Sequence, residues 1–152
     1  MIKIIYYSTI NGSWICYHFL KEGDSETMAK LYFKYGQMNA SKSMQLLSIA
    51  HNYEEQGKTP LLLTPAIDDR YIVGKITSRV GISKDAYAIR ENDDIFKVVK
   101  TTMPDCVLID EAQFLSKVHI LQLVQVVKDL HIPVIAFGLK NDFKNELFEG
   151  SK

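Results

Sequence analysis

The sequence predicts an α/β protein in which a parallel β-sheet is covered by helices on both faces, and three observations support this expectation. Strand-like and helix-like segments alternate from Lys30 onward. The predicted strands lack a regular alternation of polar and apolar residues, which is typical of parallel strands buried on both faces. A glycine-containing loop at residues 36–43 lies between the first of these strands and the first helix, as in phosphate-binding α/β proteins.

The strands are predicted from short apolar runs bounded by turn residues. The run at residues 106–109 is apolar throughout, and Pro104 precedes it. Pro133 begins the last strand in the same way. The expected strands are residues 30–35, 59–64, a short one at Ile76, 87–89, 106–109 and 134–137.

The helices are predicted from apolar residues at helical spacing and from residues that cap helix ends. The first spans residues 44–56 and is expected to end at Gly57. The second spans residues 93–100, with Asp93 or Asn92 as its N-cap. Ser116 is expected to cap the third. The expected apolar faces are Leu46, Leu47, Ala50 and Tyr53 in the first helix, and Val118, Leu121, Val124, Val127 and Leu130 in the third.

Composition indicates one ordinary globular domain. The chain has 152 residues, 47% of them hydrophobic, and 18 basic residues balance 18 acidic ones. No bulk charge therefore attracts the protein to nucleic acid or to a membrane surface. Cys16 and Cys106 are too far apart in sequence to indicate a disulfide framework or a zinc cluster, and Cys106 is expected to be a small buried residue. The apolar stretch at residues 2–20 is too interrupted for a membrane span, so we expect a cytoplasmic protein.

The first 27 residues differ from the rest and form a separate N-terminal extension in this interpretation. Asn11-Gly12 between two β-rich runs predicts a hairpin. A disordered extension and a non-native segment upstream of a natural start at Met28 are the open alternatives. Residues 28–152 are expected to form the main domain.

Residues 36–43 follow the G-x-x-x-x-G-K-S/T pattern of phosphate-binding loops, with Ser41 in place of the second glycine. Backbone N–H groups of such a loop surround a polyphosphate, and the dipole of the following helix adds to the attraction. Lys42 is expected to reach the β- and γ-phosphates, and Ser43 to offer its hydroxyl to Mg²⁺. For the loop taken alone, a structural turn is the alternative. The loop comprises Gly36, Gln37, Met38, Asn39, Ala40, Ser41, Lys42 and Ser43.

Asp110 and Glu111 directly follow the apolar run at residues 106–109. This position is the carboxyl edge of a buried strand, where α/β sheets bind ligands. Asp110 is expected to assist Mg²⁺, and Glu111 to accept the proton of an attacking hydroxyl. A solvated acidic loop is the alternative for this pair taken alone, but its place downstream of a phosphate-binding loop favours the metal site.

Five segments in a fixed order extend over residues 28–152, about four-fifths of the chain. They are Met28-Ala29-Lys30-Leu31-Tyr32-Phe33, Gly36-Gln37-Met38-Asn39, Asp68-Asp69-Arg70-Tyr71, Asp110-Glu111-Ala112-Gln113-Phe114 and residues 138–151. Together they resemble the tetrameric, zinc-containing (type II) thymidine kinases of bacteria. The last segment is similar to a signature of that family almost residue for residue.

The resemblance implies a RecA-like P-loop NTPase fold and transfer of the γ-phosphate of ATP to the 5′-hydroxyl of thymidine, with Mg²⁺ as cofactor. It implies that residues 36–43 bind ATP, that Asp110 assists Mg²⁺ and that Glu111 is the general base. It further implies a cytoplasmic homotetramer without a nucleic-acid or membrane partner. Six positions match further roles in the family: Asp68 and Arg70 beside the transferring phosphates, and Met38 and Phe143 on the thymine, with Phe114 and Phe148 supporting the pocket.

Ser41 is the first departure from the family pattern. A side chain there hinders the close approach of backbone to phosphate and adds strain of about 1–3 kcal/mol. We therefore expect a raised KM for ATP, which the substitution Ser41→Gly should lower in steady-state kinetics. An unchanged KM would contradict this explanation.

The second departure lies at Lys152, where the family continues with a zinc-binding segment and a loop that closes over the nucleoside. The chain has none of the matching ligand positions, so we expect ATP and Mg²⁺ but no zinc, and an apparently truncated kinase. The alternative is an impaired or inactive remnant that only binds nucleotide. A third interpretation, an unrelated P-loop ATPase that acts on protein or nucleic acid, leaves residues 138–151 unexplained.

Overall fold

The computed structural model describes residues 2–9, 12–19, 30–36, 42–66 and 74–139. In these residues one sheet has the strand order β1-β2-β3-β9-β8-β4-β7, and a second pairs β5 with β6. The strands are β1 (Ile2–Thr9), β2 (Gly12–Phe19), β3 (Lys30–Gly36), β4 (Pro60–Pro65), β5 (Lys75–Thr77), β6 (Ser83–Asp85), β7 (Tyr87–Ile89), β8 (Cys106–Ile109) and β9 (Val134–Leu139). The helical segments are α1 (Lys42–Glu55), α2 (Ile95–Thr102), the short 3₁₀ turn η1 (Ala112–Phe114), α3 (Lys117–Gln125) and the π-helical turn η2 (Val126–Leu130).

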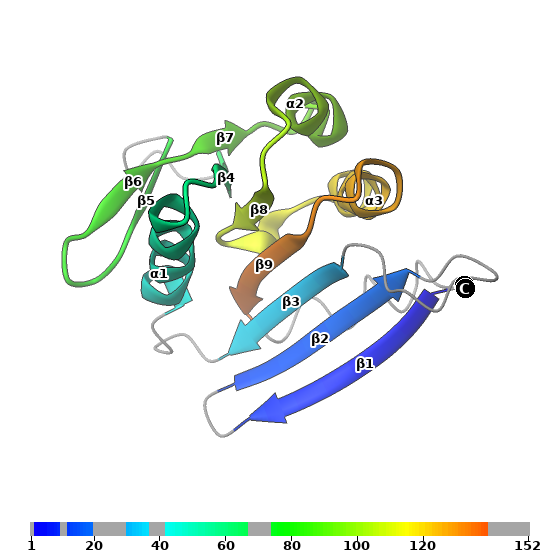
Figure 1. Ribbon diagram of the computed structural model, residues 1–152, viewed down its shortest axis with the longest axis horizontal. Helices are drawn as coiled ribbons and strands as arrows, with labels where there is room; N and C mark the ends of the chain where they lie inside the picture. Colours follow the sequence, from blue (N-terminus) through cyan, green and yellow to red (C-terminus); the bar gives the residue numbers. More distant parts are fainter. Residues whose placement is uncertain (1, 10–11, 20–29, 37–41, 67–73, 140–152) are drawn as a thin grey trace.

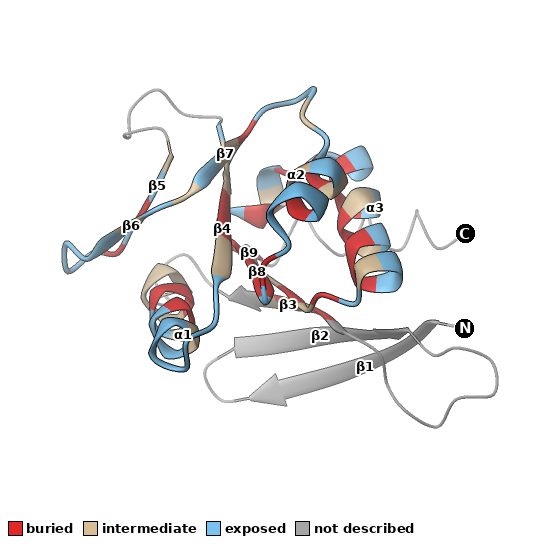
Figure 2. Ribbon diagram, turned by 45° about the horizontal axis from the view of Figure 1, so that its top comes forward, coloured by how far each residue is buried: buried red, intermediate tan, exposed pale blue. Residues whose placement is uncertain are grey.

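The predicted parallel sheet with helices on both faces is confirmed. Strands β3, β9, β8, β4 and β7 are parallel to one another. Helix α1 covers one face, and α2 and α3 cover the other (Figure 1). Figure 2 shows buried residues along β4 and β8 and on the helices beside them.

Strand β8 shows why its sequence is apolar throughout. Cys106 and Leu108 belong to the core cluster on the α1 face, whereas Val107 and Ile109 belong to the cluster on the α2 and α3 face. Successive side chains of a strand point to opposite faces, so a strand that is covered on both sides needs apolar residues at every position. Burial also raises the pKa of the Cys106 thiol to about 12, in agreement with its predicted role as a small buried residue.

The first two strands extend the parallel sheet with an antiparallel pair. Strand β1 pairs with β2 from Ile2 opposite Phe19 to Thr9 opposite Gly12, and β2 pairs with β3. Residues 2–9 and 12–19 therefore pair as the hairpin alternative expects. Asn11, at its expected turn, lies outside the described residues.

Helix α1 matches its prediction within two residues at each end. Leu46, Leu47 and Ala50 are buried against the sheet, as expected. Gly57 has a φ of 73°, and its N–H donates to the carbonyl of Glu54 at 3.0 Å. A glycine takes this left-handed conformation without strain, which explains why α1 ends there.

The predicted N-cap of α2 is wrong by one or two residues. The cap is Asp94, whose carboxylate accepts from the backbone N–H of Lys97 at 3.2 Å. Asp93 instead accepts from the N–H of Arg90 at 2.9 Å, so its carboxylate closes the turn that precedes the helix. Asn92, Asp93 and Asp94 are consecutive polar residues, and each of them is of a type that caps helices. Only the path of the turn before α2 determines which one is the cap.

The substitution Asp94→Ala is therefore expected to lower the free energy of unfolding by about 0.5–2 kcal/mol, because it leaves a helical N–H without its acceptor. Urea denaturation followed by circular dichroism measures this loss. Asn92→Ala is the matched control and should change the free energy by less than about 0.5 kcal/mol, since Asn92 is exposed. A larger effect of the Asn92 substitution would contradict the assignment of the cap.

Helix α3 is capped by Ser116 as predicted, and its expected apolar face is buried only in part: Val127 lies in the core, and Val124 and Leu130 pack against it. The N–H of His119 donates to Ser116 Oγ at 3.2 Å. Val118 and Leu121 are exposed, whereas His119, Ile120 and Leu123 are buried. His119 Nε2 lies 3.0 Å from the carbonyl oxygen of Asp93, so a polar residue occupies the buried face where it meets the loop before α2. The helix carries apolar residues on nearly all of its sides, so their spacing alone did not show which side is buried.

Candidate active site

The carboxyl ends of the parallel strands bring two distant segments together. Strand β3 ends at Gly36, β8 ends at Ile109, and β9 lies between them. Helix α1 begins at Lys42, just beyond the end of β3 in sequence. The sheet therefore places the start of α1 and the acidic pair that follows β8 at the same edge.

Ser43 and Asp110 meet at this edge. Ser43 Oγ donates a hydrogen bond to Asp110 Oδ2 at 2.9 Å, although the two residues are 67 positions apart. Asp110 is only 7% exposed, and its other oxygen, Oδ1, accepts from the backbone N–H of Glu111 at 3.0 Å. Both carboxylate oxygens are thus held in place. A hydroxyl and a carboxylate together offer the hard oxygen ligands that Mg²⁺ prefers, so the residues present fit this cation.

Burial and nearby charges shift the pKa values of Asp110 and Lys42. Burial raises the pKa of Asp110, while the Ser43 hydroxyl bond lowers it. Burial lowers the pKa of Lys42, and the carboxylates of Glu111 and Asp110 oppose this shift. Arg79 lowers the pKa of Lys42 further. The site therefore combines a partly desolvated ammonium with a buried acid, and both perturbations are typical of functional sites.

Glu111 differs from its neighbour in exposure and in backbone conformation. Its side chain is exposed, and its φ of 52° is in the left-handed region, which is uncommon outside glycine. Gln113 Nε2 donates a hydrogen bond to Glu111 Oε2. The buried carboxylate of Asp110 thus faces the start of α1, while the exposed carboxylate of Glu111 is oriented by an amide and is accessible to a substrate. Sequence reasoning did not identify the role of Gln113, because an i+2 contact of this kind depends on the turn.

The remaining predicted site residues are only partly described. Phe114 lies in η1 and its ring is 55% exposed beside Glu111, so it is open to a ligand at this edge. The other predicted positions lie outside the described residues, and their roles stay predictions. These are Gln37, Met38, Asn39, Ala40, Ser41, Asp68, Arg70, Phe143 and Phe148.

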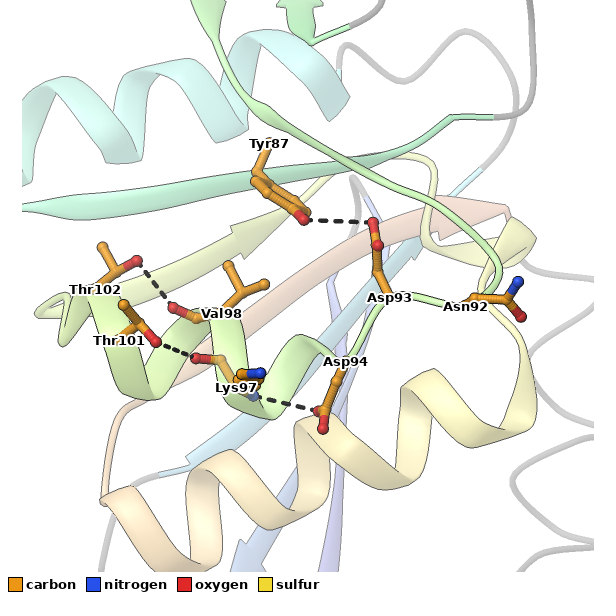
Figure 3. A pocket seen from close by; sticks show the side chains of 8 residues that line it. All are labelled: Tyr87, Asn92, Asp93, Asp94, Lys97, Val98, Thr101 and Thr102. Atoms are coloured by element: carbon orange, nitrogen blue, oxygen red, sulfur yellow. Dashed lines mark hydrogen bonds between the residues drawn. The ribbon is translucent and has the colours of Figure 1, made fainter.

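A separate cavity of about 540 Å³ lies between β7 and α2 (Figure 3). Most of the residues that line it are polar, and Tyr87 Oη lies 3.4 Å from Asp93 Oδ2 at its wall. Among the predicted site residues that the structure describes, none borders this cavity.

Comparison with known proteins identifies the family. The sequence profile of thymidine kinase matches residues 29–152. The chain belongs to the thymidine kinase family. A thymidine kinase of Lactiplantibacillus plantarum is 54% identical over 127 residues, which are 82% of this chain and 66% of the relative.

Two further thymidine kinases show the same degree of similarity. That of Listeria innocua is 55% identical and that of Lactococcus lactis is 57% identical, each over 127 residues. The matched region covers 82% of this chain in both cases, and 66% and 67% of the relatives. This member of the thymidine kinase family thus spans about two thirds of the length of its curated relatives.

Two further findings concern the length of the described helices and the grouping of side chains that could bind a metal ion. Within residues 42–66 and 74–139, where all the described helices lie, none is long and apolar enough to cross a membrane. In the described part of the chain, no three His, Cys, Asp or Glu side chains are grouped in a way that would hold a metal ion by themselves. Protein-bound Mg²⁺ usually has one or two carboxylate ligands together with water and phosphate oxygens.

Proposed function

We propose that this chain transfers the γ-phosphate of ATP to the 5′-hydroxyl of thymidine. The hydrogen bond between Ser43 and Asp110 carries the proposal, because it joins the first turn after the predicted phosphate-binding loop to the acid at the end of β8. Membership of the thymidine kinase family supports the choice of thymidine as the acceptor. A cytoplasmic homotetramer is part of the same proposal and is supported by the resemblance alone.

The triphosphate of ATP would be held by residues 36–43, with the Lys42 ammonium against the β- and γ-phosphates. Ser43 and Asp110 would hold Mg²⁺, which neutralises phosphate charge when it is bound. Asp68 and Arg70 would lie beside the transferring phosphate. Partial burial of Lys42 strengthens its attraction for phosphate, because water screens the charges less.

Glu111 would accept the proton of the 5′-hydroxyl as its oxygen forms a bond to the γ-phosphorus, while the bond from that phosphorus to the bridging oxygen breaks and ADP leaves. Its carboxylate is exposed, and the amide of Gln113 orients it. The thymine would pack against Met38 and Phe143, with Phe114 and Phe148 supporting the pocket. Positioning of this kind is the main source of rate in phosphoryl transfer, since the protein makes few covalent changes itself.

Incubation of the purified chain with ATP, Mg²⁺ and labelled thymidine tests the proposal. Formation of thymidine monophosphate, abolished in the Glu111→Gln variant, is the expected result. If the chain binds nucleotide but its turnover does not exceed that of Glu111→Gln, the proposal fails and the chain is a remnant that only binds nucleotide. ATP hydrolysis that is stimulated by nucleic acid, without a nucleoside product, would indicate an unrelated ATPase.

A further inference from the structure

Lys34 of strand β3 is a charged residue that lies beside apolar neighbours in the sheet. It is the register partner of Phe137 in β9, which is fully buried in the core cluster on the α1 face. Register partners on adjacent strands share a face of the sheet, so Lys34 lies on the face that α1 covers (Figure 1). Cys106 and Leu108 of β8 belong to the same cluster and are fully buried. A charge at such a place is costly unless a polar group binds it.

Gln45 of helix α1 binds the ammonium group of Lys34. Lys34 Nζ donates a hydrogen bond to Gln45 Oε1, and both side chains are half-buried. Partial burial lowers the pKa of Lys34, in agreement with a side chain that lies between the sheet and the helix. The aliphatic part of a lysine packs on apolar surface while its charged end reaches a polar group. The hydrogen bond therefore connects β3 to α1 directly.

This contact fixes the first turn of α1 from a second direction. Gln45 lies in that turn, and so does Ser43, whose hydroxyl donates to Asp110 after β8 at 2.9 Å. The start of α1 is thus connected to β3 by one hydrogen bond and to the end of β8 by another, and β9 lies between these two strands. A single hydrogen bond would allow the helix to turn about it. Two bonds on opposite sides of β9 prevent that rotation.

We propose that Lys34 is a positioning residue of the active site, which acts through Gln45 to keep the Ser43 hydroxyl aligned with Asp110. This inference rests on the proposed function, because it assumes that Ser43 and Asp110 hold the Mg²⁺ of bound ATP. In this role Lys34 touches no reacting atom. Phosphoryl transfer depends mainly on positioning, and a displacement of about 1 Å can lower a rate about 10²-fold. Loss of the contact should therefore affect ligand binding as well as stability.

A double-mutant cycle on Lys34 and Gln45 tests the proposal, with calorimetric titration of Mg²⁺-ATP as the measurement. Methionine keeps most of the length of both side chains and removes the hydrogen bond. Lys34→Met and Gln45→Met are each expected to weaken Mg²⁺-ATP binding about tenfold, the effect of one charge-assisted hydrogen bond. The double variant should bind no more weakly than either single variant, because both changes remove the same contact. Lys34→Arg keeps a charged donor and should stay within about threefold of the unmodified chain.

Hydrogen exchange of the chain without nucleotide provides a second measurement that requires no turnover. In Lys34→Met the backbone amides of Leu46 and Leu47, near the start of α1, should exchange faster. The amide of Leu123 in α3 should exchange as in the unmodified chain, because the lost contact is local. Equally faster exchange in both helices would show a general loss of stability and would contradict a positioning role.

Gln56→Met and Lys75→Met are the matched controls, because both residues are exposed and lie outside the first turn of α1. Both should leave Mg²⁺-ATP binding unchanged. An unchanged affinity in Lys34→Met would overturn the proposal. Losses that add up in the double variant would also overturn it, since Lys34 would then act on the ligand independently of Gln45. Failure of the proposed function is distinguishable: the unmodified chain would bind Mg²⁺-ATP without phosphorylating thymidine, and the cycle would still decide whether Lys34 positions the nucleotide site.

Discussion

Replacing Glu111 by glutamine is expected to lower the kcat of thymidine phosphorylation by about 10²–10⁴, the usual contribution of a general base. The amide has nearly the same shape as the carboxylate, so the left-handed turn and the contact with Gln113 can persist. Binding of ATP should change little, because in the proposed function Lys42 and Ser43, and not Glu111, hold the phosphates and Mg²⁺. Single-turnover kinetics with saturating ATP and thymidine would measure the effect on the chemical step.

Glu91→Gln provides the matched control for this measurement. Glu91 is exposed between β7 and α2, and β7 is two strands away from β8 in the sheet. Its substitution removes the same charge and should leave kcat unchanged. A Glu111→Gln variant as active as the unmodified chain would show that another group, or water, accepts the proton.

The second large effect is expected in stability, from Leu123→Ala. Leu123 is fully buried in the core cluster between α3 and the sheet. Truncation of a buried leucine removes apolar burial and leaves a cavity, at a cost of about 2–5 kcal/mol. The net stability of a domain is about 5–15 kcal/mol, so a substantial part of it would be lost. Urea denaturation should show a lower midpoint.

Leu121→Ala is the control, because it makes the same chemical change two positions away on the same helix. Leu121 is 54% exposed, and its truncation should cost less than about 0.5 kcal/mol beyond any effect on helix propensity, which alanine favours. Equal losses for the two leucines would show that the outer face of α3 is covered in solution. The pair therefore also tests the corrected position of the buried face of α3.

The strands of the parallel sheet could be predicted because the residue types of each strand reflect whether its two faces are buried. The run Cys106–Ile109 is apolar at every position since β8 is buried on both faces, and its bounds agree with the prediction. Strand β6 was missed, because Ser83–Asp85 pairs with β5 at the surface and carries no apolar pattern. The outer residues Val118 and Leu121 were assigned to the wrong side of α3 for the opposite reason: apolar residues nearly surround that helix.

In the candidate site, too, some features follow from local sequence patterns and others depend on the tertiary structure. Lys42, Ser43, Asp110 and Glu111 could be named in advance, because a loop that binds phosphate and an acid after a buried strand each have a local pattern. The 2.9 Å contact between Ser43 and Asp110 depends on β9 lying between β3 and β8, which no local pattern specifies. Gln113 has no such pattern, because its contact with Glu111 depends on the left-handed backbone at Glu111.

The amino-acid sequence by itself thus determined the order of the segments and the residue types of the loop and of the acidic pair. It could do so because backbone preference and burial act over a few neighbouring residues. The tertiary structure decided which oxygen of Asp110 receives the Ser43 hydroxyl and which carboxylate is buried. Distances and electrostatic interactions between residues that are tens of positions apart arise only when the sheet brings its strand ends to one edge.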